Sequence, residues 1–316
     1  IRMKILFATC SWGLGHATRD LPLIRGILKA GHDLTLVGRG RSLALLRNEL
    51  KDSCHYVSIP DYSSAYSEKD FSVAKFVGYL PIYINEIVKE HSRIKRLVRA
   101  EKYERIISDN RFGIYDKDIP SYFISHQLRF IAPARVKLFE MATEGFNYSF
   151  KENFSMFLVP DDKENPLSGD LSHNLKYFKE SKVKYLGIFS DLKKRKVEQD
   201  IDYFISLSGP EPQRTVLEKI ILKQAPFLKG KVVIALGKPE DKKERIFNHL
   251  HIFGYLERKR QEEIMNRAKL VITRSGYTTL MELVALEKKA LLIPCLLYTS
   301  DAADELDGVD LGGRRI

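Results

Sequence analysis

The sequence lacks several features that define large classes of proteins. It contains three cysteines, and the two outside residues 295–316, Cys10 and Cys54, form neither a metal-ligand spacing nor a disulfide framework. No apolar run reaches the roughly 18 residues that a membrane-spanning helix needs, and no signal-peptide pattern opens the chain. Lysine and arginine do not alternate with aromatic residues as they do in nucleic-acid-binding modules. We therefore expect a cytoplasmic protein with no nucleic-acid partner.

Acidic residues are in the minority. Lysine and arginine number 52 against 41 for aspartate and glutamate, which gives a net charge of +11 at pH 7. Residues 295–316 contribute −3 to this total, so residues 1–294 carry +14. This surplus favours anionic partners, such as phosphorylated substrates or the anionic inner face of a membrane. Peripheral contact with that membrane face is therefore one expectation.

The composition changes abruptly at Cys295. Residues 295–316 are rich in aspartate and glycine and lack the apolar periodicity that precedes them. Residues 295–304 and 309–316 resemble a translated sequencing adapter, whereas the alternative is an unstructured acidic tail. We interpret 295–316 as a non-native tail that packs poorly, which leaves the C-terminal domain truncated after Pro294.

Apolar runs alternate with helical patterns along the rest of the chain, which predicts parallel β-α-β units. We expect one such domain over residues 3–192 and a second over residues 200–294. The expected strands of the first are 4–8, 33–38, 55–60, 105–109, 121–126, 157–161 and 183–187, with helices at 20–30, 42–50 and 71–99. Those of the second are 203–208, 231–236, 250–255 and 270–273, with helices at 215–224 and 262–268.

A glycine-rich turn follows the first predicted strand. Gly13 and Gly15 permit φ > 0 and the close approach of a ligand, and the helix after them directs its free N–H groups and positive dipole end at the turn. His16 and Arg19 add a titratable imidazole and a fixed cation. The pattern predicts an anion-binding turn, and a purely structural turn remains the alternative.

Two further strands of the first domain end in polar residues. Asp109, Asn110 and Arg111 follow one of them, and His126 and Gln127 follow the next. Because parallel strands place their carboxyl ends at one edge of a sheet, we expect both groups to line the same crevice as the glycine-rich turn. An ordinary strand-to-loop cap is the alternative for each group taken alone.

The second domain repeats the order of strand, turn and helix twice. Gly209 and Arg214 stand in the first turn, which suits a pyrophosphate. The second turn begins at Arg274 and runs into a helix that carries Glu282. Its N–H groups and hydroxyls can hold a phosphate while the carboxylate grips a ribose diol. The residues expected to bind there are Arg274, Ser275, Gly276, Thr278, Thr279 and Glu282. A plain turn is the alternative for the first turn, and a capped helix with an exposed glutamate is the alternative for the second.

These motifs resemble those of a known enzyme family. The G-L-G-H-A-T-R turn and the R-S-G-Y-T-T-x-x-E segment look like the two signatures of GT-B glycosyltransferases, in the family 28-like branch that includes the peptidoglycan N-acetylglucosaminyltransferase. The S-D-x-R-x-G, H-Q-L and G-P-E-P-Q-R motifs are similar to those of uncharacterised archaeal and bacterial glycosyltransferase-like proteins. The likeness covers about residues 3–294 and implies two Rossmann-like domains that face a cleft.

The resemblance also implies an activity. A sugar, a hexose or N-acetylhexosamine, would move from a nucleotide donor, which we expect to be UDP-linked, to an acceptor whose identity the sequence leaves open, with a lipid-linked acceptor as one expectation. The donor would bind mainly to the C-terminal domain, with Glu282 on its ribose, and the acceptor to the N-terminal domain. We take His16 as the first candidate for the general base, with Asp109 and His126 after it.

No acidic metal-binding cluster stands out in the sequence, and no cofactor is expected. Helix dipoles together with Arg214 and Arg274 could stabilise the leaving diphosphate, so we expect metal-independent transfer. Two other readings stay open. One is a nucleotide-sugar 2-epimerase or hydrolase of related architecture, for which Asp109 and Glu211 are the only hints, and the other is a non-catalytic nucleotide-sugar binding protein.

Overall fold

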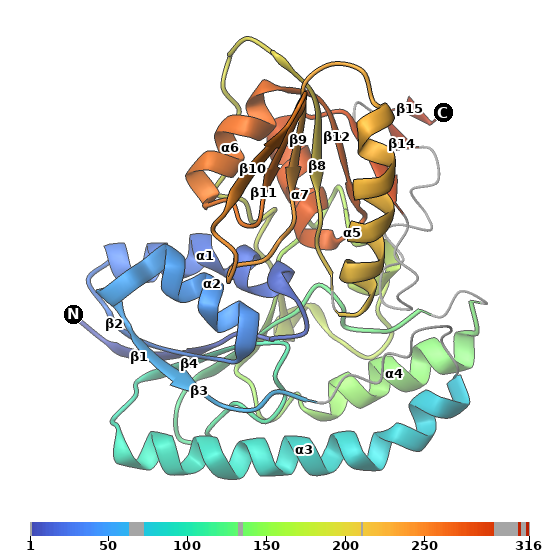
Figure 1. Ribbon diagram of the computed structural model, residues 1–316. Coiled ribbons are helices and arrows are strands. Elements are labelled where there is room, and N and C mark those ends of the chain that lie inside the picture. The colour runs from blue at the N-terminus through green and yellow to red at the C-terminus, as the bar shows by residue number, and fades with distance from the viewer. Residues whose placement is uncertain are drawn as a thin grey trace.

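The chain folds into two α/β domains, each built on one open sheet (Figure 1). The computed structural model describes residues 2–62, 73–131, 135–209 and 211–293, with side chains from residue 78 onward in the second of these ranges, and the backbone of 309–310 and 314–315. The predicted pair of Rossmann-like domains is confirmed, because both sheets are mainly parallel and helices connect their strands.

The first domain contains a seven-stranded sheet in which every neighbouring pair is parallel, in the order β3-β2-β1-β4-β5-β6-β7. Its strands are β1 (Lys4–Ala8), β2 (Asp33–Gly38), β3 (His55–Ser58), β4 (Arg105–Asp109), β5 (Ser121–Ile124), β6 (Met156–Val159) and β7 (Val183–Tyr185). Its helices are α1 (Leu14–Lys29), α2 (Gly40–Leu50), α3 (Val73–Ala100) and α4 (Lys137–Ser149).

The second domain contains a six-stranded sheet in the order β10-β11-β9-β8-β12-β13. Its strands are β8 (Ile201–Ser206), β9 (Val232–Ala235), β10 (Glu244–Phe247), β11 (Leu250–Phe253), β12 (Ala268–Arg274) and β13 (Ala290–Ile293), and only β10 runs antiparallel. Its helices are α5 (Gln213–Gln224), α6 (Arg258–Arg267) and α7 (Tyr277–Leu286). Two short strands, β14 (Val309–Asp310) and β15 (Arg314–Arg315), pair with each other.

The sequence patterns located most elements within a few residues. They missed α4 and β10. They also started α1 six residues too late, because its first residues were assigned to the glycine-rich turn, and α6 four residues too late, because Arg258–Gln261 is too polar to show an apolar stripe. The domain limits remain predictions. Leu192, the last residue assigned to the first domain, packs into the core of the second domain with Ile201 and Phe204. Apart from β14 and β15, the predicted non-native tail lies outside the described residues.

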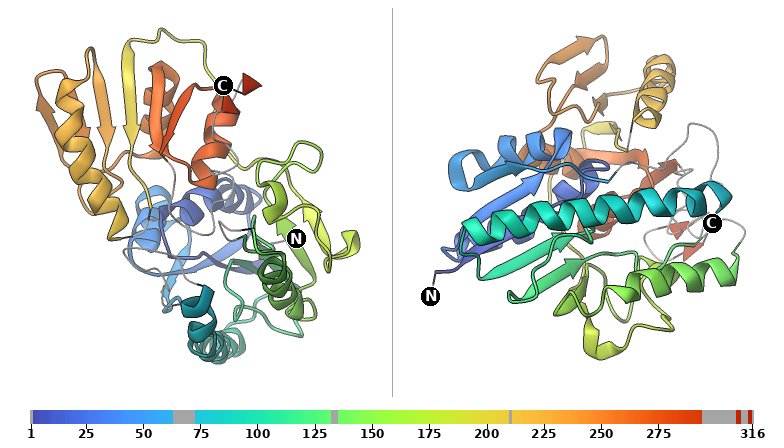
Figure 2. Two further views of the ribbon diagram at one scale, coloured as in Figure 1. Left: turned by 90° about the vertical axis from the view of Figure 1, so that its right-hand side faces the viewer. Right: turned by 90° about the horizontal axis from the view of Figure 1, so that it is seen from below.

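Helical periodicity in α1 explains how the site is positioned. Ala17, Leu21 and Ile24 share one face of the helix, and they pack on Phe7 of β1 and Leu36 of β2. The start of the helix lies against the second domain, where Thr278 of α7 donates to the carbonyl of Gly15. Figure 2 shows that α3 lies across the far side of the first domain, away from this junction.

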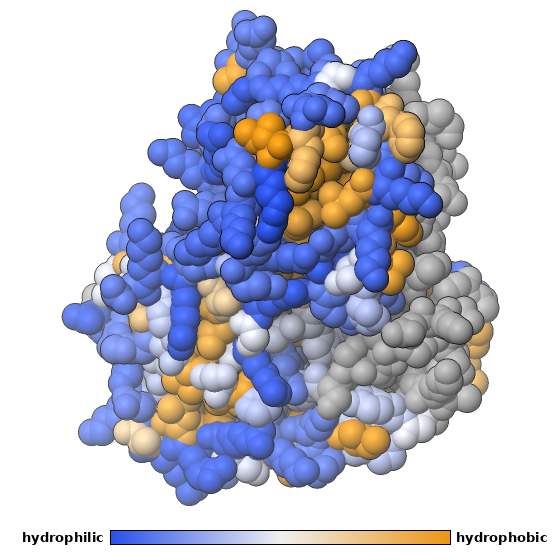
Figure 3. Space-filling model, viewed as in Figure 1, coloured by the Kyte–Doolittle hydropathy of each residue, from blue (hydrophilic) through white to orange (hydrophobic). Residues whose placement is uncertain are grey.

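The face of the molecule seen in Figure 3 is largely hydrophilic, which agrees with the many charged residues of the sequence. Hydrophilic side chains cover most of the face seen in Figure 3, and apolar ones gather on the second domain alongside α5. The exposed apolar residues of α5 are Val216 and Ile220. Among the described residues, none of the helices is both long enough and apolar enough to cross a membrane.

The S-D-x-R-x-G motif is largely a structural element. Arg111 is fully buried, lies 2.7 Å from Glu90 of α3, and also donates to the carbonyl of Pro60. The N–H of Gly113 donates to Tyr62 Oη and to Glu90 Oε2, both at 3.0 Å. The motif therefore joins β4 to α3 and to the loop after β3.

A matched pair of glycine substitutions tests this role. A Cβ at Gly113 would lie 2.5 Å from the carbonyl oxygen of Ile87, so Gly113→Ala should lower the free energy of unfolding by about 1–3 kcal/mol. Gly26, exposed inside α1, has nothing within 4 Å of its Cβ position. Gly26→Ala should therefore stabilise the protein by up to about 1 kcal/mol through helix propensity. Urea unfolding of both variants measures the difference, and an equal effect would contradict the assigned role.

Candidate active site

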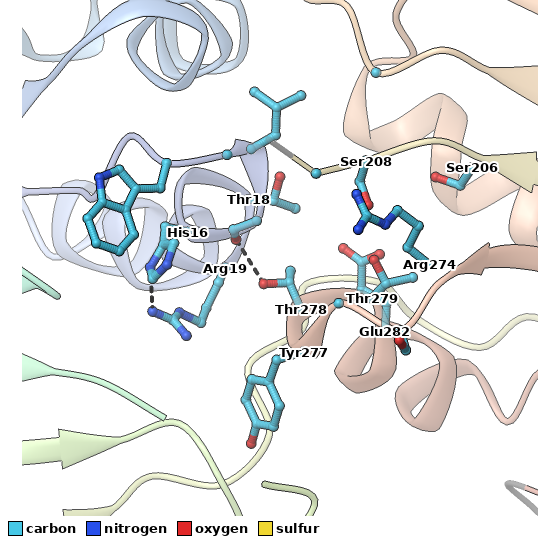
Figure 4. Close-up of a pocket in the computed structure, with 18 of the residues that line it drawn as sticks. His16, Thr18, Arg19, Ser206, Ser208, Arg274, Tyr277, Thr278, Thr279 and Glu282 are labelled. Carbon is cyan, nitrogen blue, oxygen red and sulfur yellow. Dashed lines mark hydrogen bonds between the residues drawn. The ribbon is translucent and has the colours of Figure 1, made fainter. Parts of the chain in front are cut away.

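The two domains enclose a cavity of about 240 Å³, lined from both sides (Figure 4). It lies at the carboxyl ends of β1, β4, β5, β8 and β12, where open parallel sheets bind ligands. Fourteen of the predicted site residues line it: Gly13, Gly15, His16, Arg19, Asn110, His126, Gln127, Gly209, Arg274, Ser275, Gly276, Thr278, Thr279 and Glu282. The glycine-rich turn and the R-S-G-Y-T-T segment thus face one another, as predicted.

The starts of α1 and α7 touch at this cavity. The hydroxyl of Thr278 donates to the carbonyl of Gly15 at 2.9 Å. The expectation that the glycines adopt φ > 0 is wrong, because Gly13 is extended with φ 176° and Gly15 lies within α1. A Cβ would lie no closer than 3.9 Å to its neighbours at Gly13 and 3.4 Å at Gly15, which are ordinary van der Waals distances, so the contact between the helix starts does not require glycine at either position.

His16 belongs to a buried cluster of charged groups. Its Nδ1 lies 2.8 Å from Asp109 Oδ2 and 2.8 Å from Arg19 Nη2, and Arg19 also donates to Asp109 Oδ1. Arginine only donates and a carboxylate only accepts, so Nδ1 can satisfy one of them at a time. With its proton on Nδ1, directed at Asp109, His16 keeps Nε2 as an acceptor, which is the state that a general base requires.

Asp109 itself does not line the cavity. Its side chain has no exposed surface, and it lies behind His16. Burial alone would raise the pKa of Asp109, but the charge of Arg19 and then that of His16 hold this pKa below its ordinary value. Asp109 therefore stays ionised and can stabilise a protonated His16.

His126 is held neutral in the same cluster. Burial, and then the charge of Arg19, lower the pKa of His126 well below its ordinary value. Its Nδ1 lies 2.7 Å from Arg19 Nη1 and can only accept from it, which leaves the Nε2 proton as a donor. The His126 ring stacks on Tyr277 of α7 at 4.3 Å, so this group also joins the two domains.

Sequence reasoning missed a second carboxyl group beside this cluster. Asp20 has no exposed surface, and burial followed by the charge of Asp109 raises its pKa well above the ordinary value. Asp20 follows the turn by only a few residues, but it occupies an apolar helix position that gives no sign of a neighbouring carboxylate. A neutral Asp20 keeps the cluster from carrying two negative charges.

Arg274 supplies a cation from the second domain. Its guanidinium is buried against Gly209, where a Cβ would lie 2.2 Å from Nη1 and where a φ of 114° also disfavours any side chain. Nη2 donates to Gln213 at 3.3 Å, whereas Nη1 has no hydrogen-bond partner among the described residues. A buried donor without a partner is costly, and an anion in the cavity would satisfy it.

Glu282 lies on α7, one turn after its start. Its side chain is nearly fully buried, and Oε1 accepts from Arg258 at 2.6 Å. Burial raises the pKa of Glu282 while Arg258 opposes that shift. Arg258 lines the cavity beside Glu282 and was not predicted, because a basic residue at the start of a polar helix gives no sign of its partner.

Two predicted site residues lie away from the cavity. Arg214 is buried, but its guanidinium is used by Glu211 at 2.7 Å, Glu218 at 2.5 Å and the carbonyl of Leu236. Arg111 serves the structural role described above. Both stand next to a predicted turn, and the sequence does not say whether a side chain there turns toward the cavity or into the core.

Several cavity residues were not predicted. The apolar ones from the first domain have no chemical signature of their own, and Tyr277 stands inside a recognised motif without an assigned role. The residues concerned are Trp12, Leu14, Thr18, Leu45, Phe130, Leu171, Ser206, Leu207, Ser208, Ala235, Gly237, Tyr255, Leu256, Arg258, Gln261 and Tyr277. Within the described ranges, no group of three or more His, Cys, Asp or Glu side chains could hold a metal ion.

This architecture defines a class of protein: two Rossmann-like domains around one cavity, the GT-B fold. Solved structures agree. The calicheamicin glycosyltransferase CalG4 has 15% identity and a TM-score of 0.59 over 97% of this chain and 83% of that one. The spinosyn rhamnosyltransferase SpnG, in complex with thymidine diphosphate, has 11% identity and a TM-score of 0.60, covering 96% and 83%. Arabidopsis thaliana UGT89C1, in complex with UDP-L-rhamnose, has 11% identity and a TM-score of 0.57, covering 98% and 84%.

The family comparison concerns the second domain. Residues 212–302 match the glycosyltransferase family 28 C-terminal domain, and the predicted likeness to family 28-like GT-B proteins is therefore confirmed. The match extends past Pro294 into the segment that was predicted to be non-native. No curated protein matches the chain.

The buried Nη1 of Arg274 predicts an anion effect. Inorganic pyrophosphate should raise the melting temperature of the protein at physiological salt, because a ligand that binds only the folded state stabilises it. Arg274→Met should lose most of that shift, whereas Arg93→Met, on the exposed face of α3, should keep it. Thermal melting over a pyrophosphate series measures this, and equal shifts in both variants would rule out Arg274 as the anion ligand.

Proposed function

We propose that the protein is a glycosyltransferase that moves a hexose or N-acetylhexosamine from a UDP-linked donor to an acceptor hydroxyl. The observation that carries the proposal is the meeting of two groups in one cavity. His16, backed by Asp109, lies on the first-domain side, and the start of α7 with Arg274 and Glu282 lies on the second-domain side. The GT-B fold and the family 28 domain support the same reaction class.

The donor would occupy the second-domain side. The N–H groups of Tyr277, Thr278 and Thr279 have no partners within their helix, and they stand at the positive end of its dipole. With Arg274 they suit a diphosphate, and the carboxylate of Glu282, one turn further on, suits a ribose diol. The transferred sugar would then point toward His16.

The chemistry follows from that placement. Nε2 of His16 takes the proton of the acceptor hydroxyl, the hydroxyl oxygen forms a bond to the anomeric carbon, and the bond from that carbon to the diphosphate breaks. The ionised Asp109 stabilises the protonated His16, while helix N–H groups and Arg274 stabilise the leaving diphosphate. Because fixed protein charges supply this stabilisation, we propose that no metal is needed.

The alternative enzymes need carboxylates around the sugar ring. Asp109 lies behind His16, and Glu211 pairs with Arg41 and Arg214 away from the cavity. Neither of these carboxylates is placed for epimerisation or hydrolysis. The placement of these carboxylates favours glycosyl transfer over epimerisation and over hydrolysis. His16, the proposed base, faces the donor side of the cavity, which argues against a protein that only binds nucleotide sugars.

We also propose a lipid-linked acceptor at an anionic membrane surface, with the enzyme cytoplasmic and peripherally bound. The exposed face of α3 supports this contact, since its charged residues are basic and lie next to the exposed Ile82, Ile84 and Val88. The exposed basic residues of α3 are Lys89, Arg93, Lys95, Arg96 and Arg99.

A labelling experiment tests the reaction class. The protein is incubated with UDP-sugars labelled in the sugar, with and without a lipid extract. Label that appears in lipid is the expected result and supports transfer to a lipid-linked acceptor. Release of free sugar or of an epimer would establish one of the enzyme alternatives, and binding without turnover would leave only a binding protein.

Two substitutions should separate binding from chemistry. Glu282→Ala should mainly weaken nucleotide affinity, because a charge-assisted hydrogen bond to a diol contributes about 1.5–3 kcal/mol. His16→Ala should leave affinity nearly unchanged and slow transfer by roughly 10²–10⁴-fold, the usual contribution of a general base. Calorimetric titration paired with a turnover assay measures both effects. If His16→Ala instead abolished nucleotide binding and left the turnover of bound donor unchanged, His16 would be a phosphate ligand.

A further inference from the structure

The carboxylate of Glu282 is held firmly by Arg258. Arg258 Nη1 lies 2.6 Å from Oε1 of Glu282, and both side chains are nearly fully buried. Among the described residues, the second oxygen, Oε2, has one hydrogen-bond partner, the amide of Gln261, at a long 3.4 Å. One oxygen is thus firmly fixed, and the other keeps the capacity to accept hydrogen bonds from a ligand.

Arg258 is in turn fixed by the first domain and by the segment between the domains. Its Nε and Nη2 lie 3.2 and 2.5 Å from Oδ1 of Asp191, and its backbone N–H donates to Glu49 of α2 at 3.0 Å. Arg25 of α1 completes the network, with 2.5 Å to Asp191 and 2.7 Å to Glu49. The helix that carries His16 is therefore connected by ion pairs to the residue that holds Glu282.

The balance of charges around Glu282 explains why this matters. Burial raises the pKa of Glu282, and the nearby Asp191 raises it further, whereas Arg258 lowers it. Gln261 is uncharged, so Arg258 is the cation that favours the ionised form among the groups identified around this carboxylate. Without Arg258, a buried carboxylate beside Asp191 would take up a proton at a higher pH.

We propose that Arg258 is a positioning residue for the nucleotide site: it keeps Glu282 ionised, fixes one of its oxygens, and leaves the other for the ribose diol of the donor. The proposal rests on the proposed function, because it assigns the ribose to Glu282. The proposal also implies that donor affinity depends on the first domain, because contacts with that domain hold Arg258 in place.

The pH dependence of donor binding tests this role. UDP-glucose and UDP-N-acetylglucosamine are suitable probes, because their diphosphate does not titrate near neutral pH. In Arg258→Met, affinity should fall about tenfold or more between pH 8 and pH 6, since binding needs the ionised carboxylate and a buried glutamate can titrate in that range. In the unchanged protein, affinity should vary little over the same interval.

Two further variants test whether the pH dependence of donor affinity comes from the ionisation of Glu282. Arg258→Lys keeps the charge and should restore a nearly flat pH profile, even if affinity stays lower. The double variant Arg258→Met/Glu282→Gln should also be flat, because it has no carboxylate left to titrate at this position. Thermal melting of each variant at both pH values separates loss of folding from loss of binding, and Arg258→Lys is decisive if Arg258→Met does not fold.

The possible outcomes separate a failure of the proposed function from a failure of the positioning role of Arg258. If the unchanged protein binds neither UDP-sugar, the proposed function fails. If it binds and Arg258→Met shows the same flat profile, or the double variant keeps the pH dependence, Arg258 does not act through Glu282 and the positioning role is overturned. A pH profile as steep in Arg258→Lys as in Arg258→Met would overturn it as well.

Discussion

The starts of α1 and α7 face each other across the interdomain cavity, and the rest of the site depends on this arrangement. Each helix start carries partial positive charge, and Arg274 adds a full charge from the second domain, whereas the charge of Arg19 is paired with Asp109. The hydroxyl of Thr278 joins the two helix starts by donating to the carbonyl of Gly15. Two helix starts and the guanidinium of Arg274 suit this cavity to an anion, and a diphosphate bound between the two helix starts would contact both domains.

Buried charges on the first-domain side are arranged so that they compensate one another. Arg19 contacts Asp109, His16 and His126, so a single guanidinium fixes the carboxylate and both imidazoles. Asp109 is kept ionised and Asp20 is kept neutral, because two adjacent buried carboxylates cannot both carry charge cheaply. This arrangement holds His126 as a neutral donor, whereas His16 keeps an acceptor nitrogen when its proton lies on Nδ1 and faces Asp109.

On the second-domain side of the cavity, buried charges of opposite sign also compensate one another. Glu282 remains useful as an anion only if a cation accompanies it into the interior, since an unpaired buried carboxylate would be neutralised by a proton. Arg258 is that cation, and its contacts with Asp191 and Glu49 extend the network into the other domain. The ion pairs that hold Glu282, the residue proposed to bind the donor ribose, are thus also among the contacts that join the domains.

Local sequence patterns determined much of this protein. Apolar strands followed by amphipathic helices indicated two parallel sheets, and the rule that ligands bind at the carboxyl ends of parallel strands brought Gly13, His126 and Thr278 to one cavity. These predictions succeed because strand and helix periods, and the edge at which parallel strands end, are local properties of the chain. Glu282 could be located in the same way, as a carboxylate one turn into a helix that starts at a turn.

Only the tertiary structure decided which way the side chains point and which partners they find. Arg214, Arg258 and Arg274 look alike in the sequence, yet the first is used by its own helix, the second holds Glu282, and the third has a donor that no described residue accepts. Asp20 and Asp109 are 89 positions apart in the sequence, and folding makes them electrostatic neighbours. Long-range charge pairing depends on the packing of whole domains, so it leaves no periodic trace in the sequence by which it could be predicted.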